Sequence, residues 1–190
     1  QSKRYRQNQA NLQAEKKQGI EFSPSGQNTF KGILNYLRTQ SNNQIESKVS
    51  FSTSSIGRNS DEYYQPRVVT LFEDKDKYFY TNDEPGSWLC FDFGESRVIP
   101  TDYTMKSYNC STPHPKSWVI ECSNDNSSWE TVDEENNCSY LNGASLVHTF
   151  KMNHPTSKEF RYIRIRQTGT TWSGTNHLVI DSFEIYGKLI

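Results

Sequence analysis

From residue 48 onward, apolar and polar residues alternate in short runs. The clearest run is 160–167, where Arg161, Arg164 and Arg166 stand between apolar residues. Alternation with period two is typical of a β-strand with one buried face. Similar runs predict strands at 48–54, 67–70, 78–81, 88–93, 102–107, 117–123, 129–132, 146–151 and 178–187. Turn-rich segments separate these runs, so the pattern predicts an all-β fold, an antiparallel β-sandwich or jelly roll.

Two segments before residue 48 have helical patterns. Residues 28–39 place four apolar side chains on one helix face, with Asn28 as the expected N-cap. These four are Phe30, Ile33, Leu34 and Leu37. Residues 1–19 hold five basic residues and one acidic residue and are almost entirely polar. We therefore expect a polar helical tether or linker at 1–19 and a domain at 20–190 whose β-sandwich spans 48–187. The N-terminal segment is also the candidate site of oligomerisation.

Composition and charge narrow the class of protein. Only 33% of the 190 residues are hydrophobic, but 13% are aromatic, which is more than a disordered chain carries. The formal net charge is −1, which argues against a nucleic-acid partner held by bulk electrostatics. No apolar run approaches the roughly 20 residues of a membrane helix. The first residues also lack the apolar core of a signal peptide.

No catalytic constellation stands out in the sequence. The chain has no nucleophile elbow, no zinc-protease motif and no phosphate-binding loop. Cys110 and His114 are the nearest approach to a nucleophile and base, without a third orienting group. Acidic pairs such as Asp74 and Asp76 are read as solvated loop charge, with a structural calcium ion as the lesser alternative. We therefore expect a non-enzymatic domain without a required cofactor.

Buried aromatic and cysteine side chains are expected to form much of the core. Trp88, Trp118 and Trp129 fall in or beside predicted strands and are assigned to the core. Asp92 lies in an apolar strand and needs an arginine or main-chain N–H groups as partners. The four cysteines form no CxxC pair, so we interpret them as free thiols, although an even count also permits two disulfides. They are Cys90, Cys110, Cys122 and Cys138.

A series of motifs between residues 30 and 189 gives the chain a family resemblance. In order, these are FKGILNYL at 30–37, SWLCFDFG at 87–94, SWVIECSNDNSSWETVD at 117–133, FRYIRIRQTG at 160–169 and HLVIDSFEIYG at 177–187. Together they resemble the discoidin family, the type C domain of the coagulation factors, within the galactose-binding-like superfamily. The resemblance implies the same β-sandwich that the alternation predicts.

The chain departs from the family pattern in its terminal cysteines and in its calcium segment, and both departures bear on where it works and what it binds. Extracellular members usually have a cysteine near each end, and this chain has none there. It therefore resembles the intracellular branch, whose domains often follow BTB-type or other assembly modules, and the implied location is cytoplasmic, with the cell exterior or surface as the alternative. The Asp-Gly calcium segment of the family is replaced by TyrTyrGlnProArgValValThr at 63–70, so no metal is expected.

The family resemblance also places the binding site. Members bind ligands through loops at one end of the sandwich, which correspond here to 56–66, 82–86, 109–116 and 169–177. The residues expected to bind are Arg58, Tyr63, Tyr64, Asn109, His114, Trp172, Asn176 and His177. An alternative is that Trp172 folds back over the sandwich as a lid.

Three kinds of ligand suit such a loop end. Trp, Tyr and Arg are typical of protein interfaces, so a protein partner within a larger assembly is the leading hypothesis. A galactose-like carbohydrate stacked on Trp172 is the second. A phospholipid surface is the weakest, because Asp61 and Glu62 lie among the apolar residues of the first loop.

Overall fold

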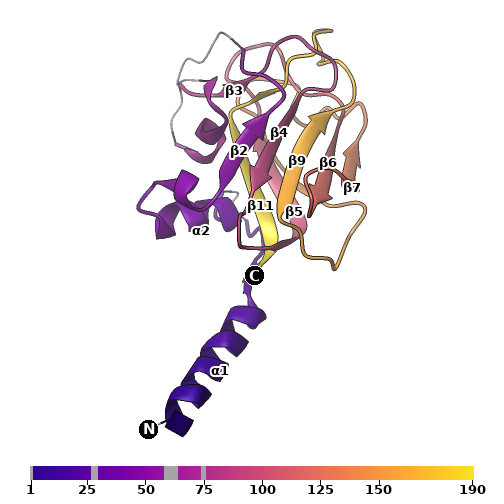
Figure 1. The fold of residues 1–190 in the computed structure, drawn as a ribbon. Coiled ribbons are helices and arrows are strands. Elements are labelled where there is room, and N and C mark those ends of the chain that lie inside the picture. The colour runs from indigo at the N-terminus through magenta and orange to yellow at the C-terminus, as the bar shows by residue number, and fades with distance from the viewer. Residues whose placement is uncertain (1, 27–29, 58–63, 74–75) are drawn as a thin grey trace.

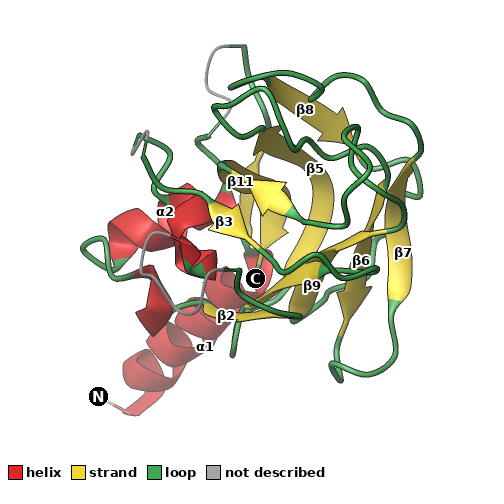
Figure 2. Ribbon diagram, turned by 90° about the horizontal axis from the view of Figure 1, so that it is seen from above, coloured by secondary structure: helices red, strands yellow, loops and turns green. Residues whose placement is uncertain are grey.

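Two antiparallel sheets pack face to face in the computed structural model, which describes residues 2–26, 30–57, 64–73 and 76–190 (Figures 1 and 2). One sheet has the order β2 (Ser50–Thr53), β4 (Trp88–Asp92), β9 (Tyr162–Gln167), β6 (Trp118–Ser123) and β7 (Glu130–Glu135). The other has the order β1 (Ile20–Phe22), β11 (Ser182–Leu189), β5 (Val98–Lys106) and β8 (Val147–Lys151). A short pair joins β3 (Phe79–Tyr80) to β10 (Val179–Ile180). The predicted all-β antiparallel sandwich is confirmed, and it extends beyond 48–187 through β1 and the end of β11.

Two strand predictions were wrong in detail. Residues 67–70 form part of a 3₁₀ helix, η3 (Pro66–Thr70), instead of a strand. Pro66 suits the first helical position because it has no N–H to leave unpaired, and the Thr70 hydroxyl bonds the Arg67 carbonyl. The single strand expected at 178–187 is two strands, because the chain changes partner at Asp181 from β3 to β5.

The helices lie outside the sandwich. The helix α1 (Ser2–Gln18) extends away from the end where the C-terminus lies (Figure 1). The helix α2 (Ile33–Gln40) packs on the domain and buries Ile33, Leu34 and Leu37, as the periodicity predicts. A short 3₁₀ helix, η1 (Ile45–Ser47), follows it. No helix in the described part of the chain is long and apolar enough to cross a membrane.

A buried carboxylate explains where α2 begins. The predicted helix 28–39 starts later, with Gly32 as its N-cap, and Asn28 lies outside the described residues. Glu184 on β11 is fully buried and accepts four main-chain hydrogen bonds of 2.8–3.1 Å, from Gly32, Leu34, Asn35 and Ile185. Its carboxylate thus satisfies donors that a helix N-terminus leaves unpaired, from a distant strand instead of a local cap.

The three tryptophans have different roles. Trp118 is fully buried and donates from Nε1 to the Tyr103 hydroxyl at 2.8 Å. Trp88 and Trp129 are only half-buried, so their assignment to the core was wrong. Both rings lie against the Arg164 guanidinium, at 6.0 and 3.8 Å from its carbon, because the strand register places Trp88 on the outer face of the sheet beside arginines.

Two carboxylates hold the arginines of that outer face. Asp92 accepts two hydrogen bonds from Arg161, at 2.7 and 2.9 Å, so its predicted structural role is confirmed. Glu121 accepts hydrogen bonds from Arg164 and Arg166, the shortest at 2.7 Å. Burial alone would raise the pKa of Glu121, but the bonds from Arg166 and Arg164 hold that pKa below its usual value. These pairs fix the sheet that carries the loops.

Candidate functional site

The predicted binding loops meet at the end of the sandwich opposite α1 and the C-terminus, the end that Figure 2 views (Figures 1 and 2). They contact one another directly. The Asn176 N–H donates to the Asp83 carboxylate at 2.6 Å, and the Trp172 N–H donates to the His114 carbonyl at 3.2 Å. The loops therefore form one surface, which we call the loop end. Arg58 and Tyr63, two predicted binding residues, lie outside the described residues.

An aromatic cluster occupies part of the loop end. It consists of Tyr64, Tyr78, Tyr80, Tyr108 and His177, all half-buried. Ring centroids lie 5.0 Å apart for Tyr64 and Tyr78 and 4.2 Å apart for Tyr78 and Tyr108. Burial, together with hydrogen bonds to Tyr108 and Tyr64, raises the pKa of Tyr78 well above its usual value, so its hydroxyl stays neutral. Tyr64 and His177 are among the predicted binding residues, and the other three are not, because an apolar strand or turn context is typical of core residues.

Most polar atoms of the predicted site are used inside the protein. His177 Nδ1 lies 2.9 Å from the Thr81 carbonyl and Nε2 lies 3.1 Å from the Tyr80 hydroxyl. A carbonyl only accepts, so Nδ1 carries a proton and donates it to Thr81. Hydrogen bonds from the Asn176 main chain and side chain lower the pKa of Asp83. His177 and Asn176 therefore fix the loops more than they offer groups to a ligand.

His114 is in the wrong place for a ligand. Its side chain is 1% exposed, so its assignment to the binding surface was wrong. Burial lowers its pKa, against the nearby main chain of Ser111 and Cys110, and neither ring nitrogen has a hydrogen bond of normal geometry. The loop turns the ring inward and leaves its carbonyl to hold Trp172. Cys110 is exposed, and its thiol donates to the side chain of Asn109, which is also exposed, and interacts with the Tyr108 hydroxyl.

The Trp172 side chain is held by a hydrogen bond and is still partly exposed to solvent. Its side chain is 38% exposed, and Nε1 donates to the Cys138 carbonyl at 3.1 Å. The Lys116 ammonium lies 4.8 Å from the ring centroid and covers one face. The indole therefore folds back, as the lid alternative holds, and also presents apolar surface to solvent.

An apolar patch that the sequence analysis missed lies beside Trp172. Six large hydrophobic side chains are exposed among the described residues, and three of them lie in these loops. We call these three the apolar patch: Tyr140, Leu146 and Trp172. Val147 is also exposed but lies on the opposite face of β8 from His148. Cys138 links the loop of Tyr140 to Trp172, and the Ser145 N–H donates to the Tyr108 carbonyl at 3.0 Å. In the sequence, the sign of these exposed side chains was apolar residues within a turn-rich segment.

Tyr140 is held in place by a neighbouring ring. It is 61% exposed and stacks on His148, with the centroids 4.0 Å apart and the rings nearly parallel. Burial lowers the pKa of His148, which keeps this ring neutral. An exposed aromatic ring with a fixed orientation loses little entropy when it is buried by a partner.

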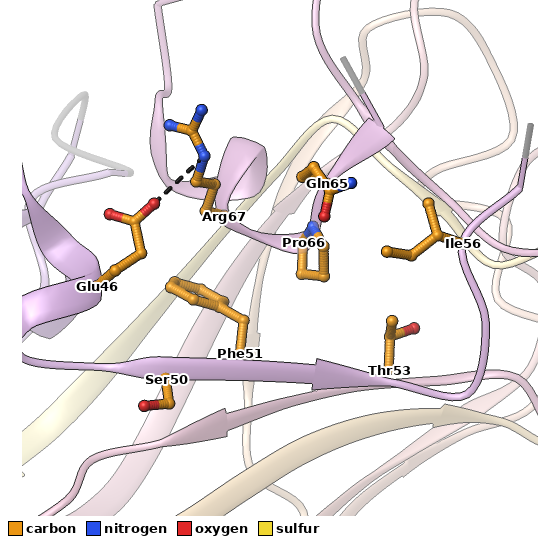
Figure 3. A pocket seen from close by; sticks show the side chains of 8 residues that line it. All are labelled: Glu46, Ser50, Phe51, Thr53, Ile56, Gln65, Pro66 and Arg67. Carbon is orange, nitrogen blue, oxygen red and sulfur yellow. Dashed lines mark ion pairs between the residues drawn. The ribbon is translucent and has the colours of Figure 1, made fainter. Parts of the chain in front are cut away.

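A pocket lies beside β2, between this strand and the ends of the first predicted loop (Figure 3). Its volume is about 380 Å³, and an ion pair between Arg67 and Glu46, 3.2 Å long, closes one side. It is lined by Glu46, Ser50, Phe51, Thr53, Ile56, Gln65, Pro66 and Arg67. This pocket was not predicted, because the residues of η3 were expected to form a strand.

The last feature of the described residues to consider is the placement of side chains that could bind a metal ion or react as thiols. Within the described ranges, no group of three or more His, Cys, Asp or Glu side chains is arranged to hold a metal ion. The four cysteines are free, as expected, and three of them are buried. Burial raises the pKa of Cys90 to about 12, so this thiol stays protonated.

Comparison with known proteins places the chain in a family and among large relatives. The F5/8 type C domain model matches residues 48–180. The E3 ubiquitin-protein ligase Ufd4 of Drosophila melanogaster is 32% identical over 117 residues. The E3 ubiquitin-protein ligase hecd-1 of Caenorhabditis elegans is 28% identical over 113 residues. Each match covers 58% of this chain and 4% of the relative, so the chain matches only a small part of the length of either relative.

Solved structures share the fold at low sequence identity. The module CpGH89CBM32-5 from Clostridium perfringens, in complex with GalNAc-beta-1,3-galactose, superposes with a TM-score of 0.58 at 9% identity, over 75% of this chain and 97% of that one. The fucolectin from striped bass (Morone saxatilis) serum gives 0.56 at 15% identity, over 74% of this chain and 47% of that one. Both carry the same sandwich.

Proposed function

The chain belongs to the F5/8 type C domain family, and on that premise we propose that it is a non-catalytic module that binds a protein partner through its loop end. The observation that carries this proposal is the apolar patch. Large apolar side chains gathered on one exposed surface are typical of protein interfaces. Trp172 and Tyr140 are of the types that dominate binding energy in such interfaces.

The relatives suggest what kind of protein the module serves. Both named relatives are E3 ubiquitin-protein ligases that extend far beyond the matched region. We therefore place this chain in a comparably large assembly inside the cell, where it recognises a partner for the rest of the protein. Free, buried thiols suit a reducing compartment.

Carbohydrate binding is the second candidate, because the module CpGH89CBM32-5 was solved with a disaccharide. A sugar needs an open aromatic face and convergent polar groups. Here the Tyr80 ring is stacked on His177 at 4.6 Å, and one face of Trp172 is covered by Lys116. Asn176 is bonded to Asp83. These contacts favour a protein partner over a sugar, and the weaker phospholipid hypothesis has no new observation in its favour.

A matched pair of variants tests the proposal. Leu146→Asp places a charge in the apolar patch, and Ile20→Asp places one on β1, where the side chain is similarly exposed (44% against 40%). Wild-type and variant chains are used to capture proteins from lysate of the source cells, with quantification by mass spectrometry. We expect Leu146→Asp to lose proteins that both wild type and Ile20→Asp retain, by about tenfold or more.

Two outcomes would contradict the proposal. Equal capture by both variants would remove the apolar patch from the interface. Release of the captured proteins by millimolar free galactose or N-acetylgalactosamine would favour the carbohydrate candidate instead.

A further inference from the structure

A free strand edge lies on the side of the domain formed by β2. The Ser54 N–H donates to the Trp88 carbonyl at 3.1 Å, so these two residues face each other as a hydrogen-bonded pair. Such pairs alternate along an antiparallel ladder. Because Phe51 faces Phe91 and Thr53 faces Leu89, the N–H and C=O groups of Phe51 and Thr53 point away from β4.

These groups lack main-chain partners on the free side. Within the part of the chain that the structure describes, β2 pairs with β4 alone, and no other main-chain group bonds to Phe51 or Thr53. Proteins usually protect such edges with proline, lysine or a bulge. The sequence of β2, SFST, contains none of these protections, and the elements that contact the strand besides β4 are the short 3₁₀ helices η1 and η3. It therefore presents two donors and two acceptors to another extended chain.

The pocket described above opens beside this edge. The side chains of Phe51 and Thr53 point into it, below Pro66 (Figure 3). Phe51, Ile56 and Pro66 give it an apolar lining, and Phe51 is backed by the core ring of Phe91, with centroids 5.7 Å apart. A volume of about 380 Å³ is at the low end for ligand sites and suits a bulky side chain from an added strand.

A second pocket, of about 360 Å³, continues along the same strand. It shares Glu46 and Ser50 with the first. Its lining is Glu46, Ser47, Lys48, Ser50, Asp92, Phe93, Gly94, Glu95 and Ser96, which is three carboxylates against one ammonium group.

Charge in the second pocket favours a cation. Arg67 pairs with Glu46 and Arg161 pairs with Asp92. Glu95 has no ion pair within the described ranges, so it is the carboxylate left for a ligand. A basic side chain next to the apolar anchor would complement it.

We propose that the free edge of β2 binds an extended segment of a partner protein, which adds a strand to the five-stranded sheet. The added strand runs antiparallel to β2, as every strand pair in the sheet does. It places a bulky apolar side chain in the first pocket and a lysine or arginine near Glu95. Main-chain hydrogen bonds supply affinity and the two pockets supply selectivity. This surface borders the first of the predicted loops through Ile56 and Gln65, but the edge of β2 itself lies outside the loop end. The proposal does not depend on the function proposed for the loop end.

Methylated peptides test the strand geometry without altering the protein. A random linear decapeptide library is selected on the full chain, and the best binder is resynthesised with a single N-methyl group at each position in turn. In an added strand only alternate N–H groups face β2. Methylation at those positions should weaken binding measured by fluorescence anisotropy by about tenfold, and by less than about twofold at the positions between.

A matched pair of variants locates the binding edge. Thr53→Pro removes an N–H that faces away from β4, so no ladder bond is lost, whereas Thr53→Val removes only the hydroxyl. We expect Thr53→Pro, but not Thr53→Val, to weaken binding by about tenfold. Ile56→Glu, in a loop, tests the first pocket if Thr53→Pro does not fold. Glu95→Gln should reduce the preference for peptides with a basic residue.

Three results would overturn the proposal. The first is that no peptide is enriched by selection. The second is that methylation shows no alternation along the peptide. The third is that binding survives both Thr53→Pro and Ile56→Glu and is lost in Leu146→Asp, which would assign the peptide to the loop end instead.

Discussion

Glu184→Gln is expected to lower the free energy of unfolding at pH 7 by about 3 kcal/mol. Each carboxylate oxygen of Glu184 accepts two main-chain N–H groups, three of them from Gly32 and the first turn of α2. Glutamine keeps one oxygen and turns an NH₂ group toward the other two donors. Two buried N–H groups would then lack acceptors, and each costs about 1–3 kcal/mol. Urea unfolding followed by tryptophan fluorescence measures the loss.

The same carboxylate predicts a pH dependence. Burial raises the pKa of Glu184 to about 7, although four main-chain N–H groups act to lower it; the ordinary value is 4.5. Between these values the folded state binds more protons than the unfolded state. The stability that this extra bound proton adds is therefore full below pH 4.5 and is lost as the pH rises to about 7, whereas the hydrogen bonds that the carboxylate accepts remain. The difference in the free energy of unfolding between wild type and Glu184→Gln should shrink over that interval.

Glu21→Gln is the control for this prediction, because Glu21 is exposed on β1. Its effect should stay within about 0.5 kcal/mol at every pH. If Glu184→Gln were as stable as this control, the hydrogen bonds that Glu184 accepts would not hold α2 on the sandwich.

Trp172→Ala combined with Tyr140→Ala is expected to weaken the affinity for a captured partner by about 100-fold, since aromatic anchors often contribute 2 kcal/mol or more. Both rings are partly exposed and fixed in orientation, Trp172 by the Cys138 carbonyl and Tyr140 by His148. Truncation removes apolar contact area without disturbing the core. The affinity is measured by surface plasmon resonance with the purified partner.

Tyr5→Ala is the matched control, because Tyr5 on α1 is 68% exposed, close to the 61% of Tyr140. It should leave the affinity within about twofold of wild type. Equal losses in Tyr5→Ala and Tyr140→Ala would mean that the partner contacts α1 and that the loop end has no special role. The melting temperature of each variant confirms that folding is intact.

Local alternation was enough to predict the sheets, and tertiary contacts account for most of the errors. The run 160–167 forms β9 because its apolar positions face the core. The assignment of Trp88 to the core failed because the register, not the residue type, decides which face a ring occupies. The strand expected at 67–70 failed because Pro66 starts a 3₁₀ turn whose valines are buried without alternation. Propensity gave no indication of either outcome.

The family resemblance supplied the loops of the candidate site, but it could not supply the arrangement of their side chains. The structure connects Tyr64 to His177 through the ring of Tyr80. The resemblance could not show that His114 turns inward, because the ring direction depends on the whole loop. Tyr140 was missed since its exposure follows from a loop that no periodicity describes.

Site-specific photo-crosslinking tests most directly whether the loop end binds a protein. Benzoylphenylalanine is introduced in place of Trp172 and, as a control, in place of Glu159, an exposed residue in the loop before β9. The chains are irradiated in lysate of the source cells, and crosslinked peptides are identified by mass spectrometry. We predict one discrete protein crosslinked at position 172 and not at 159. The same crosslinks at both positions, or none at 172 in folded protein, would contradict the account.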